Sequence, residues 1–193
     1  MLEFEKRLPS TAIKQFPATS KIIENPESSI KALSASANDQ KTREIFEKLI
    51  EDEKESIRAY LKANSNNLME KFSLTMTPAR TDIVAGYYAK NPMDIGNAIQ
   101  KIKSHYDEIK KVELYFFKNH DINIVLEEDA IDFVIEQMIS SALNLDDVYH
   151  KIETDFEHGL KLARERTGRN RYFITRDAIL NPEKFVGDLI KTT

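Results

Sequence analysis

The chain contains no cysteine and no tryptophan, and only five of its 193 residues are glycine. Without cysteine it can form no disulfide, thiolate zinc site, iron–sulfur cluster or cysteine nucleophile. This composition suits a reducing compartment, and we expect a cytoplasmic protein. The glycines at 86, 96, 159, 168 and 187 are too far apart for a Walker A loop or a dinucleotide-binding fingerprint. By itself the chain is therefore expected to hydrolyse no nucleoside triphosphate.

Long apolar runs are missing as well. No segment approaches the roughly 20 apolar residues that span a bilayer, and the first residues lack the apolar core of a signal peptide. Hydrophobic residues make up 41% and charged residues 31% of the chain, a balance typical of a soluble globular protein. The net charge of −4 is too mild to favour nucleic acid or a membrane surface as a partner. We expect protein partners.

Apolar spacing predicts a mainly helical fold. One amphipathic helix is predicted around residues 46–61, and others around 131–138 and 145–160. Between them, apolar residues spaced three and four apart form a short heptad-like seam, which would need a partner helix. This candidate interface, the seam, consists of Ile95, Ile99, Ile102, Tyr106 and Ile109.

Strand signals are few and short. Alternating apolar residues predict strands at 122–126 and 172–175, with a weaker signal at 13–19. The expected fold class is therefore α+β, mainly α, with a small short-stranded sheet. Helix starts are predicted where Asn or Thr precedes proline, as at Thr77-Pro78, Asn91-Pro92 and Asn181-Pro182.

Two short constellations resemble functional sites. Asp147 with His150, and Asp155 with His158, form Asp-x-x-His pairs on one predicted helix. The two histidines lie about two turns apart, too far to share one ion, so surface ion pairs are favoured and no metal is predicted. The aromatic run 115–117 suits either a peptide-binding face or the core, and its place at the end of an amphipathic helix favours the core.

One stretch is strongly basic. It could bind a phosphate, an acidic protein surface or nucleic acid, because guanidinium groups match such anions. The alternative is favoured: acids gather toward the start of the preceding helix and bases toward its end, as the helix dipole prefers. The six cations of this basic stretch are Lys161, Arg164, Arg166, Arg169, Arg171 and Arg176.

The two ends of the chain share a repeat. Thr19, Ile23, Asn25, Pro26 and Glu27 recur with the same spacing as Thr175, Ile179, Asn181, Pro182 and Glu183. In the second copy, a strand, helix, helix run precedes the repeated segment, whereas the first copy begins without one. We therefore expect the first copy to be cut out of a longer unit.

The segment Phe4-Glu5-Lys6-Arg7-Leu8-Pro9-Ser10, followed by a strand ending at Thr19, resembles the closing part of the small C-terminal helical subdomain of ClpX-like AAA+ ATPases. The second half, residues 122–175, is similar in its strand, helix, helix, strand plan. The resemblance implies a ring-forming, ATP-driven protein unfoldase in which ATP and magnesium belong to the parent protein. Walker A, Walker B and arginine-finger regions have no counterpart here. Arg164 follows Ala163 without the glycine of the family's Gly-Ala-Arg motif, so no sensor role is assigned to it.

The polar residues Asn64, Ser65, Asn66 and Asn67 suggest a connection, and together with the resemblance they predict three regions. Residues 1–63 would be a partial small-subdomain segment with a long amphipathic helix, 64–77 a flexible connection, and 78–193 a helical region with a small-subdomain-like unit. The expected function is that of a non-catalytic C-terminal region serving subunit contacts, ring assembly or binding of substrate proteins and other partners. The alternative is a stand-alone helical adaptor that presents the seam to a partner.

Overall fold

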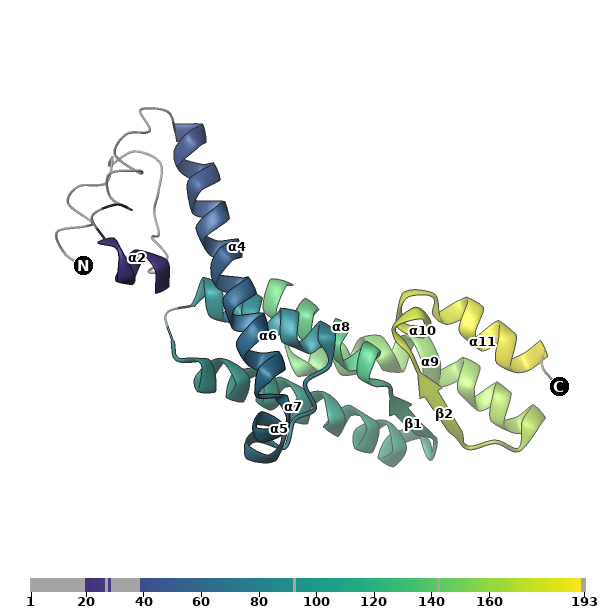
Figure 1. Ribbon diagram of the computed structural model, residues 1–193. Coiled ribbons are helices and arrows are strands. Elements are labelled where there is room, and N and C mark those ends of the chain that lie inside the picture. The colour runs from purple at the N-terminus through teal and green to yellow at the C-terminus, as the bar shows by residue number, and fades with distance from the viewer. Residues whose placement is uncertain (1–19, 27, 29–38, 92, 142, 192–193) are drawn as a thin grey trace. The chain divides into compact units, whose positions relative to one another are not determined.

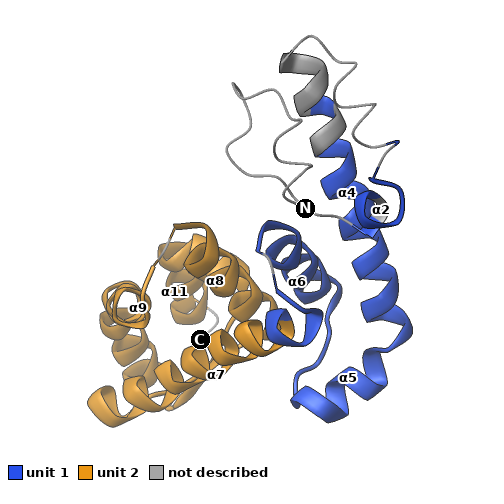
Figure 2. Cartoon of the chain, turned by 90° about the vertical axis from the view of Figure 1, so that its left-hand side faces the viewer, with its two compact units in different colours: residues 1–98 blue, residues 99–193 orange. Residues whose placement is uncertain are grey.

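The structure is a computed structural model that describes residues 20–26, 28, 39–91, 93–141 and 143–191. The chain divides into two compact units, residues 1–98 and 99–193 (Figure 2). Each contains helices, and a two-stranded sheet lies in the second, which confirms the predicted mainly helical α+β class. No described helix combines the length and apolar character needed to cross a membrane.

Unit 1 is built around one long helix. It contains α2 (Ser20–Glu24), α4 (Asp39–Ala63), α5 (Ser65–Phe72) and α6 (Pro78–Lys90), and α7 (Ile95–His120) starts at its end. Helix α6 packs against α4, where Arg58 Nε donates to Asp82 Oδ1 at 2.6 Å. Helix α2 is tied to α4 because the Ser20 hydroxyl donates to Glu53 Oε1 at 3.0 Å.

Two local predictions in unit 1 differ from the structure. The segment 64–77 was expected to be a flexible connection, but it contains α5, and its Leu68 and Leu74 are buried. Apolar burial outweighs the polar Asn-Ser-Asn-Asn composition that suggested a linker. The helix start predicted at Asn91-Pro92 is wrong as well, because Asn91 is the C-cap of α6. Helix α7 begins at Ile95, where Asp94 Oδ1 accepts a hydrogen bond from the Asn97 amide.

Unit 2 follows the predicted strand, helix, helix, strand order (Figure 1). It contains most of α7, then β1 (Asn123–Leu126), α8 (Glu128–Ser141), α9 (Leu145–Thr167), β2 (Arg171–Ile174), α10 (Arg176–Leu180) and α11 (Pro182–Lys191). The two strands pair in parallel with Val125 opposite Phe173. A parallel pair needs a long crossover, and α8 with α9 supply it.

Alternation along the strands gives the sheet two unlike faces. Ile124, Leu126, Tyr172 and Ile174 are buried in the core of unit 2. The opposite side, which we call the outer sheet face, carries Asn123, Val125, Arg171 and Phe173. The remaining predicted strand, 13–19, lies outside the described residues.

The repeated segments adopt matching structures where both are described. Helix α2 covers Ser20–Glu24 and α10 covers Arg176–Leu180, five residues each, both immediately after the repeated threonine. In the second copy Thr175 Oγ1 accepts from the Ala178 amide, and α11 begins at Pro182. The copies differ in packing, because Ile179 is buried whereas its counterpart Ile23 is 69% exposed.

Candidate functional site

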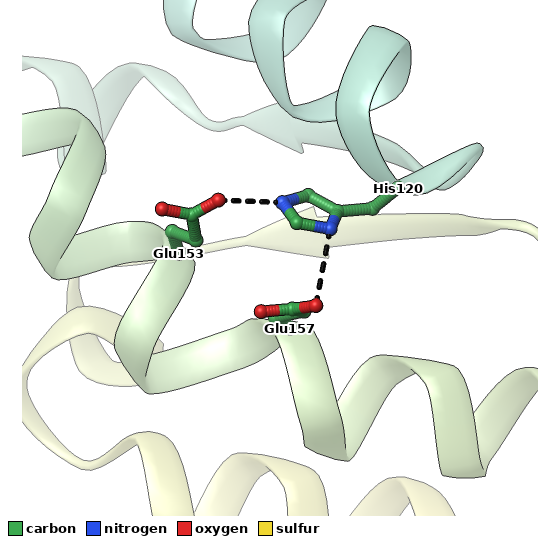
Figure 3. A group of neighbouring side chains, drawn as sticks. All are labelled: His120, Glu153 and Glu157. Atoms are coloured by element: carbon green, nitrogen blue, oxygen red, sulfur yellow. Dashed lines mark hydrogen bonds and ion pairs between the residues drawn. The ribbon is translucent and has the colours of Figure 1, made fainter.

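A histidine at the end of α7 meets two glutamates of α9 (Figure 3). His120 is the last residue of α7, and Glu153 and Glu157 lie one turn apart on the same face of α9. His120 Nε2 is 2.9 Å from Glu153 Oε1, and Nδ1 is 3.3 Å from Glu157 Oε1. Only 7% of the His120 side chain is exposed. We call these three residues the His120 cluster.

Neighbouring side chains hold the two carboxylates in place. Tyr149 donates its hydroxyl to Glu153 Oε1 at 3.1 Å and accepts a hydrogen bond from Asn119 Nδ2 at 2.6 Å. Lys161 Nζ donates to Glu157 Oε1 at 2.5 Å. This hydrogen bond, assisted by the charge of His120, lowers the pKa of Glu157 below its usual value. Burial raises the pKa of the Tyr149 hydroxyl.

Among the described residues, this is the group whose ligand atoms come close enough to surround a metal ion. Each ring nitrogen faces its own carboxylate, Nε2 that of Glu153 and Nδ1 that of Glu157. The His120 cluster therefore joins the end of α7 to α9 through side-chain contacts.

The His120 cluster was not among the residues predicted from the sequence. The spacing of Glu153 and Glu157 indicates that they share a helix face. Nothing in the sequence, however, indicates that His120, 33 residues before Glu153, contacts them. The Asp-x-x-His residues instead have other roles. Asp147 closes a capping box with Asn144 at the start of α9, and Asp155 pairs with Lys151 at 2.8 Å.

The six cations of the basic stretch have three kinds of surroundings. Lys161 pairs with Glu157, and Arg164 Nη1 donates to the Asp121 carbonyl at 2.7 Å. Two others lie over aromatic rings at 5.2 Å, Arg171 over Phe173 and Arg176 over Phe133. Arg166 and Arg169 are exposed and form no ion pair with other described residues. Some cations of the basic stretch thus contact other parts of the chain, whereas Arg166 and Arg169 remain available to bind an anion.

The seam is already used within the chain. Ile99, Ile102 and Ile109 are fully buried, and Ile95 and Tyr106 are half-buried. The Tyr106 hydroxyl donates to Glu128 Oε1 at 3.0 Å. The three buried isoleucines have no surface left for another molecule, so the seam is not retained as an interface.

An open groove lies beside the sheet of unit 2. It has a volume of about 450 Å³ and runs between one face of α7 and strand β1. We call it the α7–β1 groove, and its lining residues are Lys110, Glu113, Leu114, Phe117, Asn123, Ile124, Val125 and Arg171. Glu113 Oε1 accepts from the Leu126 amide at 2.8 Å and so satisfies a backbone donor of β1 that does not face β2.

The groove brings together residues that the sequence placed far apart. Of the predicted aromatic run, Phe116 is fully buried, as expected for core, but Phe117 lines the groove and is 39% exposed. From the basic stretch, Arg171 reaches the same groove. The apolar groove residues Leu114 and Val125 were not predicted as site residues, because their exposure depends on which strand and helix become neighbours.

The comparisons with known proteins give no relative to set beside this geometry. Models of protein families, curated proteins and solved structures were compared with the chain, and none of them matches it.

Proposed function

We propose that this chain is a non-catalytic protein-interaction region of a ClpX-like AAA+ unfoldase, serving subunit contacts, ring assembly or binding of substrate proteins. The observation that carries the proposal is the repeat. Both copies form a five-residue helix after the repeated threonine, α2 in one and α10 in the other. A chain with two versions of one terminal unit fits a duplicated small subdomain better than a single unrelated domain.

The plan of unit 2 supports the same proposal. Strand β1, helices α8 and α9 and strand β2 follow one another as in the family's small subdomain, and the strands pair in parallel. Fold likeness alone says little about activity, so the proposal is limited to protein interaction. The catalytic steps would belong to the parent ATPase.

Immunopurification from the source cells tests this proposal. An antibody to the chain, used with ATP present and again with ADP, would recover the endogenous protein for mass spectrometry and size-exclusion chromatography. We expect Walker A and Walker B sequences either in the same polypeptide or in a stoichiometric partner, in an assembly of ring size. A monomer near 22.3 kDa with no ATPase would contradict the proposal.

A stand-alone adaptor is the second candidate, and one observation favours it. The α7–β1 groove exposes apolar side chains that would serve a partner without any ring. In the immunopurification, this candidate predicts a binding partner that is not an ATPase.

A further inference from the structure

We propose that the α7–β1 groove and the adjoining outer sheet face bind a short segment of a partner protein that combines acidic and apolar residues. The inference rests on the proposed protein-interaction function and adds the chemistry of the partner. Its evidence is the exposed apolar area, the charge of the groove walls and the state of the β1 edge.

Three large apolar side chains stand half-exposed around the groove. Leu114 is 50% exposed, Phe117 39% and Phe173 49%. Leu114 and Phe117 line the groove from α7, and Phe173 stands opposite Val125, a groove residue, in the parallel register. Apolar residues that gather on one surface with polar groups at the edge mark a binding site more often than scattered ones do.

The cations available at this surface outnumber the available acids. The groove contains two cations and one acid, Glu113. Glu113 Oε1 is already held by Lys110 Nζ at 2.5 Å and by the Leu126 amide, so that pair is neutralised. Arg171 remains, with an aromatic ring and no carboxylate against its guanidinium among the described residues, and the exposed Arg169 lies two residues before it. Because guanidinium forks bind carboxylates in pairs of hydrogen bonds, an acidic partner is the complementary one.

The edge of β1 limits how the partner is held. Glu113 occupies the Leu126 amide, so an added strand could not pair with β1 there. Binding would therefore depend on side chains, with apolar anchors against Leu114, Phe117 and Val125 and a carboxylate on Arg171. The volume of about 450 Å³ suits a short segment.

Nucleic acid is the competing ligand, because arginine and phenylalanine also bind phosphates and bases. The observations favour the peptide. Glu113 lies in the groove itself, and Lys110 is committed to it, which leaves one groove cation for a backbone of repeated phosphates.

A phage-displayed library of random peptides, selected on the whole folded chain, tests the inference. We expect enriched peptides in which Asp or Glu stands next to Leu, Ile or Phe. A fluorescein-labelled copy of the selected peptide is then titrated with wild type and variants, and binding is followed by fluorescence anisotropy. Arg171→Glu and Phe173→Ser should each weaken binding about tenfold or more, because Arg171 is the expected carboxylate contact and the exposed Phe173 ring lies against it on the outer sheet face.

Controls separate the groove from general charge and from misfolding. Arg166→Glu makes the same charge change on an exposed α9 residue that does not line the groove, and should change binding less than about twofold. Arg171→Lys keeps the charge and should retain measurable binding, while circular dichroism verifies that every variant is folded. The inference is overturned by enrichment of basic peptides or of none, by equal effects of Arg171→Glu and Arg166→Glu, or by tighter binding of labelled oligothymidylate than of peptide. If any of these occurs while immunopurification still finds the ATPase, this inference fails and the proposed function stands.

Discussion

Arg80 is the largest side chain that is fully buried among the described residues of the chain. Its guanidinium donates from Nη1 to the Thr75 carbonyl at 2.6 Å, and its backbone amide donates to Thr77 Oγ1 at 3.0 Å. The arginine thereby joins the first turn of α6 to the segment that precedes it. Buried donors of this kind stabilise mainly because the acceptor would otherwise be left without a partner.

Replacement of Arg80 by methionine keeps the length and apolar stem but removes the donor to Thr75. We expect the free energy of unfolding to fall by about 2 kcal/mol, the usual value for a hydrogen bond from a charged group. Urea denaturation followed by circular dichroism measures the change. Lys90→Met, an exposed substitution in the same helix, should cost less than about 0.5 kcal/mol. Equal midpoints for the two variants would contradict the role given to Arg80.

His105 is a second residue with a measurable consequence. It lies largely buried on α7, and its Nδ1 accepts no hydrogen bond from the described residues, with Glu108 Oε2 3.7 Å away. Burial, reinforced by the charge of Lys101, lowers the pKa of the His105 ring below its usual value. The folded chain therefore takes up this proton less readily than the unfolded chain does.

The sign of the pH effect follows from that difference. Below the unfolded-state pKa of about 6.5 the unfolded chain binds a proton that the folded chain still excludes, so stability falls as the pH drops from about 7.5 to about 5.5. His105→Leu should reduce this loss, whereas His158→Gln, at an exposed position on α9, should leave it unchanged. Thermal unfolding at the two pH values measures the effect. An identical loss in wild type and His105→Leu would be inconsistent with the excluded proton.

At the scale of elements, α9 and α11 approach closely at one glycine. A Cβ on Gly159 would lie 2.4 Å from Val186 Cγ1 and 3.1 Å from Val186 Cβ, whereas a Cβ on Gly86 in α6 would meet no atom within 4 Å. Phe156 of α9 and Phe185 of α11 also meet edge to face, with ring centroids 5.9 Å apart. The absence of a side chain at Gly159 is thus what lets α11 pack on α9.

Two alanine substitutions test this packing. Gly159→Ala should push α11 away and lower the free energy of unfolding by about 1–3 kcal/mol, as overpacking does. Gly86→Ala makes the same chemical change in an open helical position and should raise stability by up to about 1 kcal/mol, because alanine has the better helix propensity. Amide hydrogen exchange should show faster exchange in α11 for Gly159→Ala alone. A stabilising Gly159→Ala would contradict the close approach.

The elements themselves could largely be predicted from the sequence, because periodicity and capping are local. Alternation at 122–126 indicated β1, and Thr77-Pro78 and Asn181-Pro182 mark the true starts of α6 and α11. The helix start predicted at Asn91 was wrong, because Asp94, three residues later, caps α7 instead. Helix α5 was missed because the burial of Leu68 depends on packing that its polar neighbours do not indicate.

The candidate sites were less predictable, because each joins residues from distant parts of the chain. The basic stretch could be recognised in the sequence as a cluster of cations. Only the structure shows that Lys161 and Arg164 have partners within the chain, whereas Arg171 lines the groove. The seam could be predicted from apolar residues spaced three and four apart. This spacing, however, cannot distinguish a helix that binds another molecule from one buried in its own chain.

At the scale of the whole molecule, the division into two units predicts separate folding of the second. The sheet and its crossover helices all lie within residues 99–193, and α7 begins at Ile95 after the Asp94 cap. A chain trimmed to residues 94–193 should therefore keep a helical circular dichroism spectrum and unfold cooperatively. Trimming to residues 122–193 removes α7 with Glu113 and His120, and should give a less stable chain. A coil-like spectrum for residues 94–193 would contradict the division.

The proposed function, a protein-interaction region of an AAA+ assembly, requires that the exposed surface of unit 2 contacts another protein. Site-specific photo-crosslinking in the source cells tests this requirement. A photoreactive phenylalanine at Phe173, 49% exposed beside the groove, is compared with one at Leu143, 38% exposed between α8 and α9. We predict a discrete crosslinked protein at position 173, identified by mass spectrometry as an AAA+ subunit or its substrate, and none at position 143. Equal labelling at both positions, or none at position 173, would contradict the claim.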